Sequence, residues 1–238
     1  MNIHPYSHNI TETEIEVIKT LGFEIRGEMG KCEDFVSRYF HNCDLLTLLR
    51  ELNDILIPVC QTKIFKSVTF SRTIPPVIKI EFQSEDCGDD ERGLILSRIF
   101  TWEEEQLVVI HDCFILPASA RYKGVGKQVY RSCIQQYVNM GVKRILVNAS
   151  LQDGGYMWAK YFFTATDQQD VAQILYKSKF TLTPKQYNAI ERIYNNYYTK
   201  NPNGRAFPIQ KWAELPFMET LLRGCQWKGV IDLTNRGV

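Results

Sequence analysis

The spacing of apolar side chains changes from helical to strand-like as the chain proceeds. In residues 1–74 the apolar positions recur at the spacing of amphipathic helices. The helical segments are 11–21, which ends at Gly22, and 44–57, which is closed by Pro58. Period-two alternation predicts a strand over 77–82, and two more strand-like runs follow at 93–102 and 107–116. Because the acidic turn 103–106 joins the last two runs, we expect an antiparallel meander.

Beyond residue 126 the pattern alternates between helix and strand. The expected elements are a helix over 127–140 ending at Gly141, a strand over 142–149, a helix over 153–163 with Asp153 as N-cap, polar tyrosine-rich helices over 167–178 and 184–198, a short helix over 219–225 and a strand over 227–233. This order predicts an α+β (mixed α/β) fold, with helices flanking a mostly antiparallel sheet. The tyrosines of 184–198 have helical spacing, which favours a packing role.

Charge and cysteine content argue against nucleic-acid binding, membrane association, secretion and a zinc site. With 28 basic and 27 acidic residues the net charge is +1, so no overall field attracts nucleic acid or an anionic membrane. The N-terminus lacks a secretory pattern, and no apolar run approaches membrane-spanning length. The seven cysteines include no Cys-x-x-Cys pair, and the four histidines complete no zinc spacing. We therefore expect a cytoplasmic protein with reduced thiols and no metal, in which Cys113 and Cys133 are core residues.

The segment from Arg121 to Lys127, Arg-Tyr-Lys-Gly-Val-Gly-Lys, lies between a predicted strand and a predicted helix. Its two glycines allow a tight turn and a close approach of the backbone to a ligand. The first N–H groups of the following helix then face that ligand, and the basic side chains add positive charge. The segment therefore predicts a site for a phosphate-bearing small molecule.

The Arg121-x-x-Gly124-x-Gly126 pattern, after three strands and before a helix–strand–helix, resembles the pyrophosphate loop of the GNAT superfamily of acyl-coenzyme A-dependent N-acyltransferases. The resemblance covers about residues 75–165, which it identifies as the acyl-CoA-binding core with a GNAT-like twisted central sheet. It leaves 1–74 as a helical N-terminal region and 166–238 as a helical accessory segment with a closing strand of the same domain.

The resemblance also implies how acetyl-CoA would be held. The residues it assigns to the cofactor are Phe114, Ile115 and Leu116 along the strand, and Arg121, Tyr122, Lys123, Gly124, Val125, Gly126 and Lys127 in the loop. The amide-rich pantetheine arm would pair with the edge of the strand, as an added peptide strand does. A backbone N–H near Leu116 would polarise the thioester carbonyl.

The catalytic residues depart from the family pattern. Relatives usually carry a Tyr-x-x-x-Gly-Phe ending whose tyrosine protonates the leaving thiolate, but here Trp158 stands at the tyrosine position and Phe162 at the glycine. Tyr156 is our candidate for the acid, with Tyr161 as the alternative. For the base, the nearby choices are Glu103, Glu104, Glu105, His111 and Asp112, of which we favour Asp112. His111 and Asp112 point to opposite faces of the strand, and His111 equally fits a core position.

The sequence therefore predicts a GNAT-type N-acyltransferase, most simply an acetyltransferase, that acts on a primary amine. The acceptor can be a small molecule, a protein or an aminoacyl-tRNA, and the segment after Phe163 is expected to wall or cover its site. The alternative is a GNAT-fold module that binds CoA or a protein partner without catalysis, which Trp158 and Phe162 favour. An acetyltransferase toxin or effector is a further possibility. The residues do not indicate an oligomeric state.

Overall fold

The structure is a computed structural model that describes residues 10–27, 32–40, 42–89, 91–150 and 153–234. The described chain divides into two compact units. Unit 1 contains the described residues up to Lys143, and unit 2 those from Arg144 onward. None of the described helices is long and apolar enough to cross a membrane.

Unit 1 is an antiparallel meander with helices against it. Its elements are α1 (Glu12–Thr20), β1 (Phe23–Arg26), α2 (Cys32–Tyr39), α3 (Leu45–Leu56), β2 (Ile64–Ser71), β3 (Val77–Ser84), β4 (Ile95–Glu103), β5 (Gln106–Ile115) and α4 (Val125–Asn139), with short 3₁₀ turns at Ile57–Val59 and Ala118–Ala120. The strands lie in the order β1-β2-β3-β4-β5. Strand β1 runs parallel to β2, and the other neighbours pair antiparallel.

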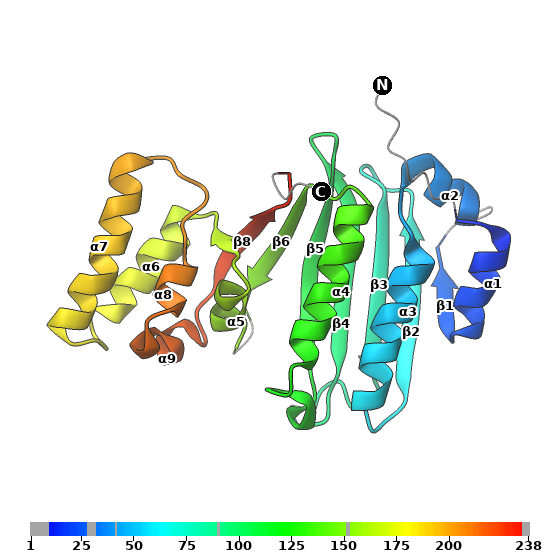
Figure 1. The fold of residues 1–238 in the computed structure, drawn as a ribbon, viewed down its shortest axis with the longest axis horizontal. Coiled ribbons are helices and arrows are strands. Elements are labelled where there is room, and N and C mark those ends of the chain that lie inside the picture. The colour runs from blue at the N-terminus through cyan, green and yellow to red at the C-terminus, as the bar shows by residue number, and fades with distance from the viewer. Residues whose placement is uncertain (1–9, 28–31, 41, 90, 151–152, 235–238) are drawn as a thin grey trace. The chain divides into compact units, whose positions relative to one another are not determined.

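Helices α3 and α4 lie side by side across one face of the unit 1 sheet (Figure 1). The apolar stripe of α3, from Leu45 to Leu56, is buried. A polar contact also joins the two helices, because Gln136 of α4 donates a 2.8 Å hydrogen bond to the Glu51 carboxylate of α3. Helix α4 is thereby tied to α3, and the loop that precedes α4 leads into a helix that is packed against its neighbour.

The expectation that residues 1–74 form a helical region was incomplete, because this stretch also contributes β1 and β2. The burial along β2 follows no clean alternation, since Ser67 and Val68 are both buried. Strand β1 has only four residues and pairs solely with β2. Both strands depend on partners distant in the sequence, which periodicity cannot detect. The predicted boundary after residue 74 lies between β2 and β3, which pair with each other.

Unit 2 combines a small antiparallel sheet with several helices. Its elements are β6 (Arg144–Ala149), α5 (Gly154–Lys160), β7 (Thr164–Ala165), α6 (Gln168–Ser178), α7 (Pro184–Lys200), α8 (Gln210–Ala213), a 3₁₀ turn at Pro216–Met218, α9 (Glu219–Leu222) and β8 (Trp227–Asp232). Strand β8 lies between β6 and β7 and pairs antiparallel with both. The two units confirm the predicted mixed α/β class with mostly antiparallel strand pairing.

The core of unit 2 is built from aromatic residues. Trp212 and Trp227 are fully buried, and their indole N–H groups donate to the carbonyl oxygens of Ile190 and Gly155 at 3.2 and 3.1 Å. Three tyrosines of α7 pack around Phe207, and these are Tyr194, Tyr197 and Tyr198. This agrees with the packing role that their helical spacing indicates.

Candidate functional site

The loop predicted to bind an anion links β5 to α4. After β5 ends at Ile115, the chain makes a short turn and is extended at Arg121. It then enters the left-handed region twice, at Tyr122 with φ 61° and at Gly124 with φ 83°. Alternation between left-handed and other conformations turns neighbouring backbone N–H groups toward one side, which is the geometry of an anion-binding nest. The structure thus places two left-handed residues where the sequence predicts a phosphate site.

Helix α4 begins two residues earlier than the sequence indicates, at Val125. Its first α-helical turn closes when the N–H of Gln128 donates to the carbonyl oxygen of Gly124 at 3.0 Å. The N–H groups of Val125, Gly126 and Lys127 therefore belong to the helix end that has no intrahelical acceptors. This end also carries the positive pole of the helix dipole, which favours an anion.

Gly124 is the N-cap of α4, and its conformation explains why glycine stands there. A φ of 83° strains most other residues. A Cβ built on Gly124 meets no atom within 4 Å, so the space in front of it is open. Val125, in contrast, is buried and anchors the helix. The glycine therefore serves the backbone conformation, and it leaves the first turn accessible.

Arg121 ties the loop back to the strand. Its Nε donates a 2.8 Å hydrogen bond to the carbonyl oxygen of Leu116, which lies just past the end of β5. The guanidinium is half-buried, whereas Lys123 and Lys127 are exposed. Phe114 and Ile115 pair with Leu96 and Ile95 of β4. The residues predicted to hold acyl-CoA thus form one continuous path from β5 to α4.

Asp112, the candidate base, occupies a β-bulge that sequence reasoning missed. The register steps from Ser97 opposite Cys113 to Arg98 opposite His111, so Asp112 is the extra residue on β5. Its exposed carboxylate accepts a 3.0 Å hydrogen bond from the hydroxyl of Ser97. A bulge re-aims the side chains around it, and the Asp112 side chain is exposed here.

Arg98 holds this bulge from the buried side. Only 1% of Arg98 is exposed, and one guanidinium nitrogen donates to the carbonyl oxygens of Ser97 and Cys113 at 2.8 and 2.9 Å. The guanidinium also lies 5.4 Å from the centre of the Phe114 ring. Its contacts therefore stabilise the course of β5 next to the predicted cofactor residues. Nothing in the sequence pattern distinguishes this arginine from the solvent-facing ones on other strands.

His111 takes the core position that the sequence left open. It is 2% exposed, and its Nε2 lies 3.1 Å from the hydroxyl of Tyr137 on α4. Burial holds the pKa of His111 well below its usual 6.5, and the nearby charge of Arg98 lowers it further. The imidazole is therefore neutral at physiological pH and faces the core. Among these two candidates, Asp112 is the one that an amine can approach.

Tyr156, the candidate acid, lies on α5 in unit 2, whereas Asp112 lies in unit 1. Burial is the first cause that raises the pKa of Tyr156, and the Glu219 carboxylate, which accepts from its hydroxyl, is the second. The Arg223 guanidinium is 5.6 Å from the ring centre and pairs with Glu219 at 2.8 Å. Asp153 occupies the N-cap position of α5 as predicted, but its side chain makes no capping hydrogen bond and pairs with Arg223 instead. Glu219 and Arg223 were missed, although their i,i+4 spacing is a sequence signal for an ion pair.

Trp158 of α5 packs against two aromatic residues that follow the helix. The Trp158 ring lies 5.2 Å from that of Phe163 and 6.1 Å from that of Tyr161. Phe162, which stands where the family pattern has glycine, adopts a φ of 68° while 62% of it is exposed. The backbone therefore takes the left-handed conformation typical of glycine, although the residue is phenylalanine.

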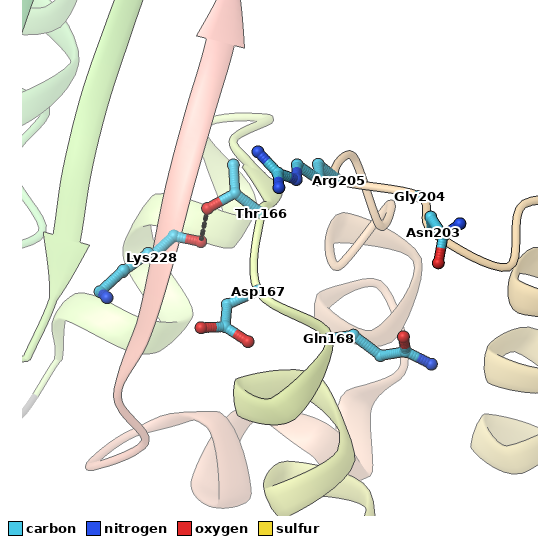
Figure 2. A pocket seen from close by; sticks show the side chains of 7 residues that line it. All are labelled: Thr166, Asp167, Gln168, Asn203, Gly204, Arg205 and Lys228. Carbon is cyan, nitrogen blue, oxygen red and sulfur yellow. Dashed lines mark hydrogen bonds between the residues drawn. The ribbon is translucent and has the colours of Figure 1, made fainter.

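A hollow lies within unit 2 and was not predicted. It has a volume of about 500 Å³ and is lined by Thr166, Asp167, Gln168, Asn203, Gly204, Arg205 and Lys228 (Figure 2). These residues come from the start of α6, the turn after α7, and β8. Within the described ranges, no group of three or more His, Cys, Asp or Glu side chains is arranged to hold a metal ion.

Comparison with known proteins gives a limited likeness. No family profile matches the chain, and no curated protein matches it. Among solved structures, the chain is similar to the crystal structure of a GNAT family acetyltransferase from Elizabethkingia anophelis with acetyl-CoA bound. The identity is 14%, the TM-score is 0.28, and the match covers 38% of this chain. It spans 56% of that chain, little more than half of its length.

Proposed function

We propose that this protein is an acyl-CoA-dependent N-acyltransferase that transfers an acyl group, most simply acetyl, to a primary amine. The observation that carries the proposal is the loop from Arg121 to Lys127. It combines two left-handed residues, an open glycine and the exposed first turn of a helix directly after an antiparallel meander. The pyrophosphate of acyl-CoA fits this arrangement through backbone N–H groups and the dipole of α4.

In the proposed reaction, the pantetheine arm lies along the segment 114–116 and the thioester carbonyl accepts from a backbone N–H near Leu116. The amine nitrogen attacks the carbonyl carbon and forms a C–N bond, and the C–S bond then breaks. Asp112, directly or through water, takes the proton that the amine loses, and Tyr156 protonates the departing thiolate. The acceptor is a small molecule or a protein amine, and positioning of the two reactants supplies much of the rate.

A non-catalytic CoA-binding module is the second candidate, and one observation favours it. Trp158 stands at the position of the family's acid and packs against Phe163, so this position cannot supply a proton. The two candidates differ in one measurement, the release of free thiol from acetyl-CoA in the presence of a panel of primary amines. Turnover with any acceptor supports the enzyme, and CoA binding without turnover on every acceptor supports the module.

The proposed CoA site is tested by Gly124→Asp with Gly124→Asn as its matched control. Both side chains tolerate the left-handed conformation and serve as N-caps, and the open space at Gly124 admits either. Only aspartate places a negative charge where the diphosphate would lie. Calorimetric titration with CoA should show a loss of affinity of about tenfold or more for the aspartate variant, with a much smaller change for asparagine. Equal affinity of the two variants would refute the site.

A further inference from the structure

The hollow in unit 2 brings two opposite charges together from distant parts of the chain. Asp167 precedes α6, and Arg205 follows the turn after α7. Figure 2 shows both side chains at the hollow, with the ammonium of Lys228 directed away from Arg205. Lys228 contributes its backbone instead, since its carbonyl oxygen accepts from the N–H and the hydroxyl of Thr166 at 2.9 and 3.2 Å.

The charges of Asp167 and Arg205 are not neutralised by ion pairs within the part of the protein that the structure describes. One oxygen of Asp167 caps α6 by accepting from the N–H of Gln169 at 2.8 Å. The cap fixes the direction of the Asp167 carboxylate, which leaves its second oxygen available to a ligand. The hollow therefore presents a carboxylate and a guanidinium at once.

Helix α7 of the same unit carries a buried hydroxyl. Tyr198 of α7 is 8% exposed and stacks on Phe207 with the ring planes 3° apart. Its hydroxyl has no hydrogen-bond partner among the described residues. Burial raises the pKa of Tyr198, and the nearby Tyr194, Tyr197 and Asp167 raise it further. An unsatisfied buried hydroxyl is unfavourable, so this part of unit 2 holds a polar group that lacks a partner among the described residues.

We infer that this hollow binds a small zwitterion, such as an α-amino acid, with its ammonium against Asp167 and its carboxylate on Arg205. A simple anion would be repelled by Asp167 and a simple cation by Arg205, whereas a zwitterion is complementary to both. The volume of about 500 Å³ lies in the range of small-molecule sites. Thr166, Gln168 and Asn203 add polar walls rather than an apolar lining. This inference stands on unit 2 alone and does not depend on acyl-CoA.

The test uses the full chain without acyl-CoA and the twenty unmodified L-amino acids, screened singly by saturation-transfer NMR. The best binder is then titrated by calorimetry beside its α-carboxamide and its N-acetyl derivative. We expect the carboxamide, which lacks the carboxylate, and the N-acetyl form, which lacks the ammonium, each to lose about tenfold or more in affinity. If only one derivative lost affinity, the site would recognise only one of the two charges, and the proposal would be overturned.

Two variants test which side chain binds the ammonium of the amino acid and which binds its carboxylate. Asp167→Asn keeps the oxygen that caps α6, so the fold is retained, and it should abolish the discrimination against the N-acetyl derivative. Arg205→Gln should abolish the discrimination against the carboxamide. Arg192→Gln, an exposed arginine of α7 outside the hollow, is the matched control and should change neither. The absence of binding by every amino acid at about 10 mM, or unchanged binding in both variants, would overturn the inference.

Discussion

Arg121 and Leu116 are joined by a 2.8 Å hydrogen bond from the Nε of the arginine to the carbonyl oxygen of the leucine. This contact connects the beginning of the anion-binding loop to the end of β5. One side chain therefore sets the distance between the proposed diphosphate site and the strand segment proposed for the pantetheine arm. Because the guanidinium is half-buried, it is held more firmly than the exposed lysines of the same loop.

Arg121→Ala removes this connection together with one positive charge. We expect the affinity for CoA, measured by calorimetry, to fall by about tenfold or more, since hydrogen bonds to charged groups contribute about 1.5–3 kcal/mol. Arg131→Ala is a suitable control, because Arg131 is an exposed residue on α4 outside the loop. Equal losses in the two variants would show that the effect is one of general charge.

His111 should make the stability of the protein depend on pH. Burial and Arg98 lower its folded-state pKa well below 6.5, and Tyr137 and the buried thiol of Cys133 lie on the helix packed against it. Above pH 6.5 the imidazole is neutral in both states, and below it the unfolded chain binds a proton that the folded chain does not. The free energy of unfolding should therefore fall by up to about 1.4 kcal/mol per pH unit below pH 6.5.

Urea unfolding between pH 7.5 and about 5 measures this dependence, above the range in which ordinary carboxylates titrate. His111→Gln can still pair with Tyr137 but cannot titrate, so its stability should vary less over the same range. Parallel curves for the parent protein and the variant would contradict the assignment.

Tyr156→Phe separates chemistry from binding. If Tyr156 protonates the leaving thiolate, thiol release should fall by at least about 100-fold while the affinity for CoA is preserved. Tyr161→Phe is the comparison, because Tyr161 packs against Trp158 and burial raises its pKa. A full rate for Tyr156→Phe would return this residue to a packing role, and a loss confined to Tyr161→Phe would move the acid there.

Tyr197 and Tyr198 allow a paired test of the unit 2 core. The Tyr198 hydroxyl is buried without a partner among the described residues, whereas that of Tyr197 accepts from the N–H of Ala206 at 3.0 Å. In the ligand-free protein, Tyr198→Phe should raise the free energy of unfolding by about 1 kcal/mol, and Tyr197→Phe should lower it by a similar amount. Thermal or urea unfolding measures the two changes in the free energy of unfolding. A destabilised Tyr198→Phe variant would show that the Tyr198 hydroxyl has a hydrogen-bond partner in solution.

Features that depend on neighbouring residues were determined by the sequence itself. Thr11 and Glu14 form a capping box at the start of α1, and Pro58 follows the end of α3. The meander of β3, β4 and β5 appears within a few residues of its predicted bounds. The left-handed Gly124 before α4 follows from the same local rules, because the conformational freedom of glycine requires no distant partner. The candidate anion loop was therefore visible in the sequence alone.

Features that depend on distant partners were decided only by the tertiary structure. Strands β1 and β2 exist through pairing, and the bulge at Asp112 is defined by its register against β4. Arg98 and His111 carry polar groups on strands like many others, and only packing buries them. The hollow at Asp167 and Arg205 joins segments nearly 40 positions apart in the chain. Periodicity indicates which side of a helix or strand is apolar, but it does not indicate which elements pack against each other. Burial of polar side chains and pairing of charges depend on that packing, so only the tertiary structure decides them.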